Sequence, residues 1–157
     1  MTSSNKKILI HAFGNSGRGD DGLGKEFIKK IEDWIKKNEI HSIDTECSFQ
    51  LNVEHAATMS NYDIVIFVDA SKADIEHYSF DRVLCESQYS FTSHSISPSI
   101  LLSVCKELYN NSPLVYLLQV KGYHWEFGAG LSTNASKNLQ NALKFIKTTI
   151  TGFQNQE

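Results

Sequence analysis

The sequence predicts an α/β fold, a doubly wound sandwich around a mostly parallel sheet of about five strands. Short apolar runs alternate along the chain with amphipathic stretches that have helical spacing. The longest apolar runs contain few polar residues, which is typical of parallel strands covered on both faces. The chain has 157 residues, a length that suits one hydrophobic core, so we expect a single domain over residues 1–157.

Five segments have the length and composition of strands. The most apolar of them, DIVIFVDA at 63–70, should lie at the centre of the sheet. The segment 79–86 alternates polar and apolar residues, which favours an edge strand. The expected strands are 6–13, 42–49, 63–70, 79–86 and 113–120.

Four segments are expected to be helices, and one of them has a clear start signal. Ser97 stands at the capping position and Pro98 at the first helical position, where its missing N–H has no cost. The last residues, 152–157, are polar and are expected to fray. The expected helices are 22–38, 53–60, 97–111 and 130–150.

Composition argues against several classes of protein. The net charge is −3 and the basic residues form no block, so we expect no nucleic-acid partner. The apolar runs are too short to cross a bilayer or to form a signal peptide, so we expect no membrane partner. Three widely spaced cysteines predict reduced, buried thiols rather than disulfides or a zinc knuckle. We therefore expect a monomer in the cytoplasm.

One stretch carries most of the functional signal. HAFGNSGRGDDGLGKEF, residues 11–27, places five glycines and two adjacent aspartates between a strand and a helix. Residues 17–22 satisfy G-x-G-x-x-G, so a nucleotide-binding α/β enzyme is one alternative. Two aspartates would, however, stand where the charge of a pyrophosphate belongs, and they would repel it.

The aspartates fit a cation better than an anion. The positive end of a helix favours ionised carboxylates, so Asp20 can cap the helix while Asp21 is free to bind an ion. Asp69 ends the central strand, at the edge of the sheet where such folds bind ligands. His94, in SFTSHSISPS, can complete the set. Two carboxylates and an imidazole suit a divalent ion such as zinc or nickel, with positions left open.

Each of these residues also has an ordinary structural interpretation. Asp21 can be a second capping acid, Asp69 can bind the amides of its own turn, and His94 can be a solvated surface residue. Among the other histidines, His11 is expected to pack in the core and His124 is a minor site candidate. The remaining three are expected to be solvated: His41, His55 and His77.

Four segments, taken in order, resemble the hydrogenase maturation proteases. They are GNSGRGDDGLG, YDIVIFVDAS, TSHSISPSILL and GYHWEFGAGLS, and the resemblance covers residues 6–147. It implies a three-layer α/β/α sandwich with a metal site formed by Asp21, Asp69 and His94. The first ligand is often Glu in that family and is Asp here. The region 71–92 departs from the pattern, and no role is transferred to it.

The resemblance also implies a substrate and a reaction. The substrate is the precursor of a nickel–iron hydrogenase large subunit, and the family removes its C-terminal extension after nickel insertion. In one mechanism the trio holds its own metal, which activates a water. In the other, which we favour, the precursor brings the nickel and Asp21 or Asp69 is the general base. Zinc or cadmium would then act as surrogates. A non-catalytic chaperone that binds nickel and precursor is the alternative.

Overall fold

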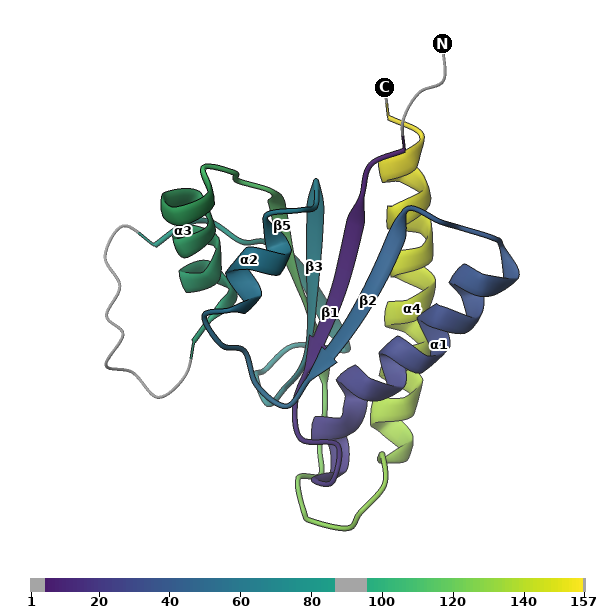
Figure 1. Cartoon of the computed structure of the whole chain (residues 1–157). Coiled ribbons are helices and arrows are strands. Elements are labelled where there is room, and N and C mark those ends of the chain that lie inside the picture. The colour runs from purple at the N-terminus through teal and green to yellow at the C-terminus, as the bar shows by residue number, and fades with distance from the viewer. Residues whose placement is uncertain (1–4, 87–95, 157) are drawn as a thin grey trace.

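The computed structural model describes residues 5–86 and 96–156. Their five strands form one sheet in the order β2-β1-β3-β5-β4, in which only β4 runs antiparallel to its neighbour (Figure 1). The expected doubly wound, mostly parallel sheet is therefore confirmed, with β3 at its centre. The strands are β1 (Ile8–Phe13), β2 (Ile43–Ser48), β3 (Ile64–Ser71), β4 (Tyr78–Arg82) and β5 (Leu114–Lys121).

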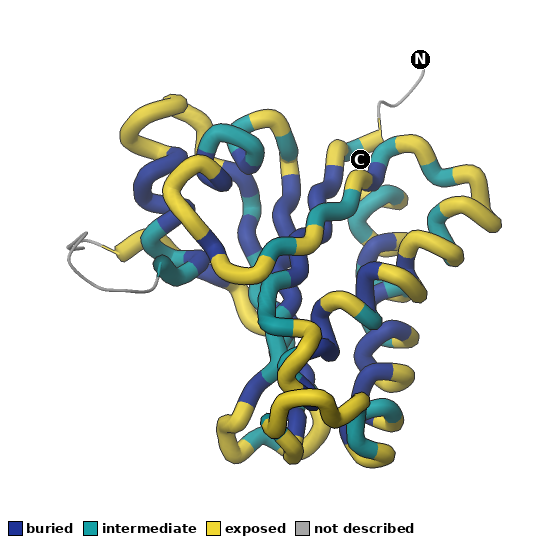
Figure 2. Tube along the Cα trace, turned by 60° about the horizontal axis from the view of Figure 1, so that its bottom comes forward, coloured by how far each residue is buried: buried dark blue, intermediate teal, exposed yellow. Residues whose placement is uncertain are grey.

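Helices cover both faces of the sheet and complete the three layers. Figure 1 shows α1 (Leu23–Lys37) and α4 (Thr133–Gln154) on one face, with α2 (His55–Met59) and α3 (Pro98–Tyr109) on the other. Each face has its own apolar cluster, and alternate residues of the strands contribute to the two clusters. The strands and the inward sides of the helices are buried, whereas the connecting loops are largely exposed (Figure 2).

The start of α3 follows from its sequence. The Ser97 side chain accepts a hydrogen bond from the Ile100 amide at 3.2 Å, and Pro98 is the first helical residue, as expected. Asn110, with a φ of 49°, ends the helix in the left-handed region that Asn tolerates. The edge position expected for residues 79–86 is also confirmed, because β4 pairs with β5 alone.

The expectation of a frayed end is wrong for residues 152–154, which continue α4. The Gln154 side chain donates to the Lys6 carbonyl at 3.1 Å and to the Ser42 hydroxyl at 2.8 Å. It also accepts a hydrogen bond from the Lys6 amide at 3.1 Å. These long-range bonds fix the end of the helix beside the start of β1, and no local pattern in the sequence announces them.

Burial corrects two further expectations. Cys47 and Cys85 are exposed, because they lie in or beside the edge strands, and only Cys105 is buried. His55 is buried rather than solvated, because α2 packs against the sheet. His11 is fully buried, as expected. Burial lowers the pKa of His11 to about 3, with a further contribution from His55, so this imidazole is neutral in the core.

Within residues 5–86 and 96–156, none of the helices combines the length and the apolar character that crossing a bilayer requires.

Candidate functional site

The loops that leave β1, β3 and β5 meet at the carboxyl edge of the sheet, at the bottom of Figure 1. The chain passes from β1 to β2 on one side and later to β3 on the other, so the strand order reverses between β1 and β3. Open α/β sheets bind ligands at such a switch point. The glycine-rich turn at 14–22 follows β1, and Asp69 lies in the last part of β3.

Asp20 fixes the loop between β5 and α4. Its carboxylate accepts bonds from the amides of Tyr123 at 2.7 Å and His124 at 3.0 Å, and from the amide and hydroxyl of Ser132 at 2.7 and 2.8 Å. Burial alone would raise the pKa of Asp20, but these hydrogen bonds outweigh it and lower the pKa. The expectation that Asp20 caps the helix is wrong, since neither the turn η1 (Gly19–Gly22) nor α1 has a side-chain cap.

Asp21 is positioned by the Gly14–Asn15 pair. The Asn15 amide donates to the Asp21 carboxylate at 2.8 Å. Gly14 has a φ of +145°, and a β-carbon placed there would lie 2.6 Å from the Asp21 backbone oxygen and 3.1 Å from its Oδ1. Only glycine allows this approach. The two residues therefore hold the Asp21 side chain between the end of β1 and the start of α1.

Asp69 and Asp21 face the same cavity, which has a volume of about 260 Å³. Burial raises the pKa of Asp69 to about 7, and the negative charge of Asp21 contributes to the rise. A hydrogen bond from the amide of Ala70, the next residue of β3, offsets part of the rise. The two carboxylates repel each other, and a cation between them would relieve that repulsion. The cavity is lined by Arg18, Asp21, Asp69, Ala70, Lys72 and Trp125.

Two basic residues and an aromatic loop form the rim of this cavity. The Lys72 ammonium lies 4.9 Å from the centre of the Trp125 ring. Arg18 donates from Nε to the Trp125 carbonyl at 3.0 Å, and its guanidinium lies 5.6 Å from the centre of the Phe127 ring. Phe127 is itself 76% exposed. The sequence marks 121–130 as a loop at the active edge, but it does not show that Trp125 forms a wall of the cavity.

The glycines of the G-x-G-x-x-G pattern serve the protein's own loop. A β-carbon on Gly19, whose φ is +55°, would collide with the His124 carbonyl. The Gly128 amide also donates to the Gly17 carbonyl at 3.0 Å. The space that a dinucleotide-binding turn offers to a pyrophosphate is therefore occupied by residues 124–128.

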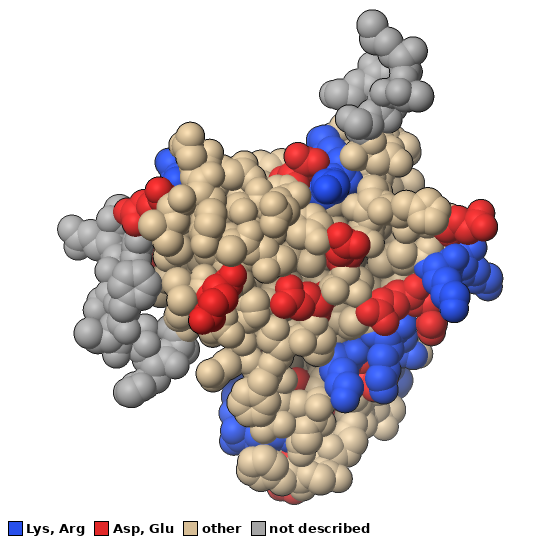
Figure 3. Space-filling view, viewed as in Figure 1, with Lys and Arg blue, Asp and Glu red and all other residues tan. Residues whose placement is uncertain are grey.

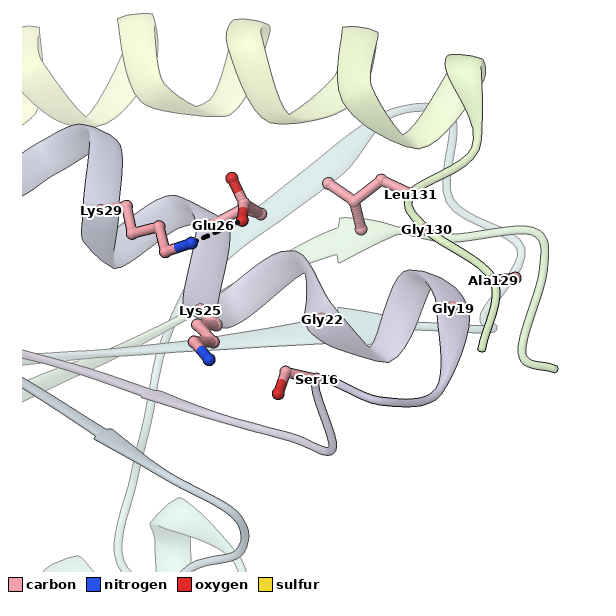
Figure 4. Close-up of a pocket in the computed structure, with 9 residues that line it drawn as sticks. All are labelled: Ser16, Gly19, Gly22, Lys25, Glu26, Lys29, Ala129, Gly130 and Leu131. Carbon is pink, nitrogen blue, oxygen red and sulfur yellow. Dashed lines mark hydrogen bonds and ion pairs between the residues drawn. The ribbon is translucent and has the colours of Figure 1, made fainter. Parts of the chain in front are cut away.

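A second cavity, of about 190 Å³, also flanks η1 (Figure 4). Its walls include glycine backbone, the side chains of Ser16, Lys25 and Leu131, and an ion pair in which Lys29 lies 3.4 Å from Glu26. This cavity has one acidic side chain, Glu26, and that carboxylate is paired with Lys29. It therefore lacks the two facing carboxylates of the first cavity. We therefore take the cavity of Asp21 and Asp69 as the candidate site.

The third expected site residue, His94, lies outside the described residues. The structure thus brings Asp21 and Asp69 to one cavity and gives no position for His94. The minor candidate His124 is exposed, and its backbone rather than its ring contacts Asp20 and Gly19.

Comparison with known proteins gives relatives in sequence and in structure, although no family model matches the chain. A curated protein of Methanocaldococcus jannaschii, named as a candidate hydrogenase maturation protease, is 28% identical over 151 residues. That alignment covers 90% of this chain and 94% of the relative. The chain resembles the hydrogenase maturation proteases in sequence and in fold.

Two solved structures of hydrogenase maturation proteases are similar to this chain in fold. HycI from Thermococcus kodakarensis superposes with a TM-score of 0.72 at 19% identity, over 95% of each chain. HybD from E. coli, a hydrogenase maturating endopeptidase, has a TM-score of 0.72 at 16% identity, over 93% of each chain. At these identities the structures establish the hydrogenase maturation protease fold for this chain, and the sequence relative agrees with them.

Proposed function

We propose that the protein is an endopeptidase that removes the C-terminal extension of a nickel–iron hydrogenase large-subunit precursor after nickel insertion. One observation carries the proposal: the turn η1 and the end of β3 bring Asp21 and Asp69 to a single cavity at the carboxyl edge of the sheet. The likeness to proteins named as maturation proteases supports the reaction and the substrate. We further propose that it acts in the cytoplasm as a monomer with one domain, and that it binds neither nucleic acid nor membrane.

In this proposal the nickel ion arrives as part of the substrate. Asp21 and Asp69 bind it as oxygen ligands, and His94 supplies the third ligand. The repulsion between the two carboxylates makes a cation favourable in the cavity. A site without thiolates also suits transient recognition better than permanent retention. Cleavage therefore waits until the precursor carries nickel.

The hydrolytic step needs a base that takes a proton from the attacking water. We assign this role to Asp69, which can bind the ion through one carboxylate oxygen and accept the proton on the other. With nickel bound nearby, the carboxylate is ionised, which is the form that a base requires. Asp21 is then the ligand that fixes the ion, and the bond from Asn15 holds it in place.

A mass measurement tests the proposal. The purified protein is mixed with a nickel-loaded large-subunit precursor, and the products are weighed by mass spectrometry. The wild type should shorten the precursor at its C-terminal end. Asp21→Asn, Asp69→Asn and His94→Ala should each abolish shortening, whereas Asp74→Asn, at an exposed acid in the loop after β3, should not.

Other outcomes separate the alternatives. Normal shortening by all three variants would refute the site. Stable binding of the precursor without shortening would indicate a maturation chaperone instead of an enzyme. A nucleotide-binding enzyme predicts protection from heating by a dinucleotide, and the occupied glycine turn argues against this.

A further inference from the structure

A second group of ligand-type side chains lies away from the Asp21 and Asp69 cavity, on the α2 and α3 face of the sheet. His11 of β1 and Glu46 of β2 are direct partners in the parallel pairing of these strands. His55, the first residue of α2, completes the group. One potential ligand atom from each residue lies within 4.8 Å of the other two.

The arrangement leaves a buried nitrogen without a partner. His11 is fully buried, and its Nδ1 makes no hydrogen bond, although Oε2 of Glu46 lies 3.8 Å away. Oε1 of the same carboxylate lies 3.7 Å from Nε2 of His55. Both distances exceed a hydrogen bond. Since buried polar atoms are almost always paired, the unpartnered nitrogen indicates a missing group between the three side chains.

We propose that His11, Glu46 and His55 bind a divalent transition ion of the zinc type. Metal–ligand bonds of roughly 2.1 Å in a tetrahedral site place neighbouring ligand atoms about 3.4 Å apart. The observed separations are 3.8 Å to Oε2 and 3.7 Å to Oε1 of Glu46, and the three ligand atoms lie within 4.8 Å of one another. The side chains must therefore close in by up to about 1.4 Å to reach the tetrahedral value. Two imidazoles and one carboxylate leave a fourth position open for water.

The surroundings of His11 suit this role. Its Nε2 lies 2.8 Å from the Ser48 hydroxyl. When Nδ1 binds the ion, Nε2 carries the proton and donates to Ser48, which fixes the ring as outer partners of metal ligands commonly do. Burial already keeps the imidazole neutral, so no proton has to leave the ring before it binds the ion.

His55 must change two contacts. Its Nε2 lies 3.3 Å from the Ser48 hydroxyl, and this contact is lost when Nε2 binds the ion. At present its Nδ1 accepts a hydrogen bond from the Asn52 amide at 3.0 Å. Binding through Nε2 moves the proton of the ring to Nδ1, so the Asn52 amide must turn toward water. Asn52 is exposed, which allows this movement. The proposal therefore predicts a local change just before α2 when the ion binds.

An ion has a route to the site from solvent. The Glu46 side chain is 35% exposed, whereas His11 behind it is closed off. Acidic side chains are scattered over the region of β2 and α2 in the view of Figure 3, and basic ones lie mainly over α1. The bound ion would join the edge strand β2, the neighbouring strand β1 and the short helix α2, and so brace the sheet at a distance from the hydrolytic site.

The test uses the full-length, untagged protein carrying Asp21→Asn and Asp69→Asn, so that ions cannot bind at the first cavity. After removal of metals with a chelator, titration calorimetry with Zn²⁺ should show one ion per chain. Adding Glu46→Gln or His55→Ala should weaken binding at least tenfold. The matched variants Glu54→Gln and His41→Ala, at exposed residues, should bind as the parent does. Circular dichroism verifies that each variant is folded. If His55→Ala does not fold, the result for Glu46→Gln decides the test.

A spectroscopic measurement identifies the ligands. With Cu²⁺ as the probe, electron paramagnetic resonance should show two imidazole nitrogens in the parent and one in His55→Ala. The NMR signal of the Asn52 amide should shift on addition of Zn²⁺. The proposal is refuted if the parent binds no zinc, or if Glu46→Gln binds as tightly as the parent. Neither result affects the proposed protease activity, which depends on Asp21 and Asp69.

Discussion

Replacing Asp69 with asparagine should stabilise the protein at neutral and alkaline pH. In the folded chain the pKa of Asp69 rises to about 7 from its ordinary 3.8, first because of burial and then because of Asp21. Each pKa unit corresponds to about 1.4 kcal/mol, so the ionised carboxylate costs the folded state about 4 kcal/mol. Asparagine keeps the shape of the side chain and an oxygen for the Ala70 amide, and it carries no charge.

The dependence on pH has a definite sign. Because the folded pKa is the higher one, the wild type has no penalty below 3.8, where Asp69 is protonated in both states. The penalty grows as the pH rises to about 7 and is then constant. The free energy of unfolding of Asp69→Asn, minus that of the wild type, should therefore grow by about 4 kcal/mol between pH 4 and pH 8.

Urea unfolding followed by circular dichroism, with a chelator present, measures this difference. Titrating groups away from the cavity are common to the two proteins, so their contributions cancel. The mutual repulsion of Asp21 and Asp69 is part of the measured difference. Asp74→Asn, at an exposed acid in the loop after β3, is the control and should follow the wild type across the range. A difference that does not change with pH, or a variant less stable than the wild type at pH 8, would refute this account of the cavity.

Three other substitutions test how the site is held. Asp20→Asn should lower the free energy of unfolding by about 4 kcal/mol at pH 7, because several donors of the β5–α4 loop lose a charged acceptor. Since the folded protein lowers the Asp20 pKa, the stability difference between the wild type and Asp20→Asn should shrink as the pH falls below 3.8. Urea unfolding of both proteins at each pH measures this difference. Gly14→Ala should lower the free energy of unfolding by about 2 kcal/mol through strain and should displace Asp21. The variant should therefore remain folded while its rate of precursor shortening falls. Gln154→Ala should lower the melting temperature without affecting shortening, because its bonds to Lys6 and Ser42 lie at the opposite edge of the sheet.

The sequence predicted the fold well because the two central strands, β1 and β3, consist almost entirely of apolar residues. All five residues from Ile64 to Val68 in β3 are fully buried, and such a run reads as a central parallel strand without further information. Ser97 and Pro98 act within one turn of α3, so their role is also visible locally. The end of α4 is different, because Gln154 is held by residues 112 and 148 positions away in the chain.

The site was predictable in part. Asp21 and Asp69 stand next to recognisable strand ends, and the rule for open sheets brings those ends together. The role of Asp20 was not predictable, because its partners lie more than 100 residues away and are mostly backbone amides. The group of His11, Glu46 and His55 was missed for the same reason. Its members come from three elements, and nothing in their spacing joins them.

The most direct measurement is a crystal structure of the protein soaked with cadmium or nickel, with anomalous scattering used to locate the ion. We predict a peak at the carboxyl edge of the sheet, bound by oxygens of Asp21 and Asp69 and by the His94 ring. Asp21 and Asp69 side chains that point apart, with no ion between them under saturating metal, would contradict the central claim that this cavity recognises a transition ion.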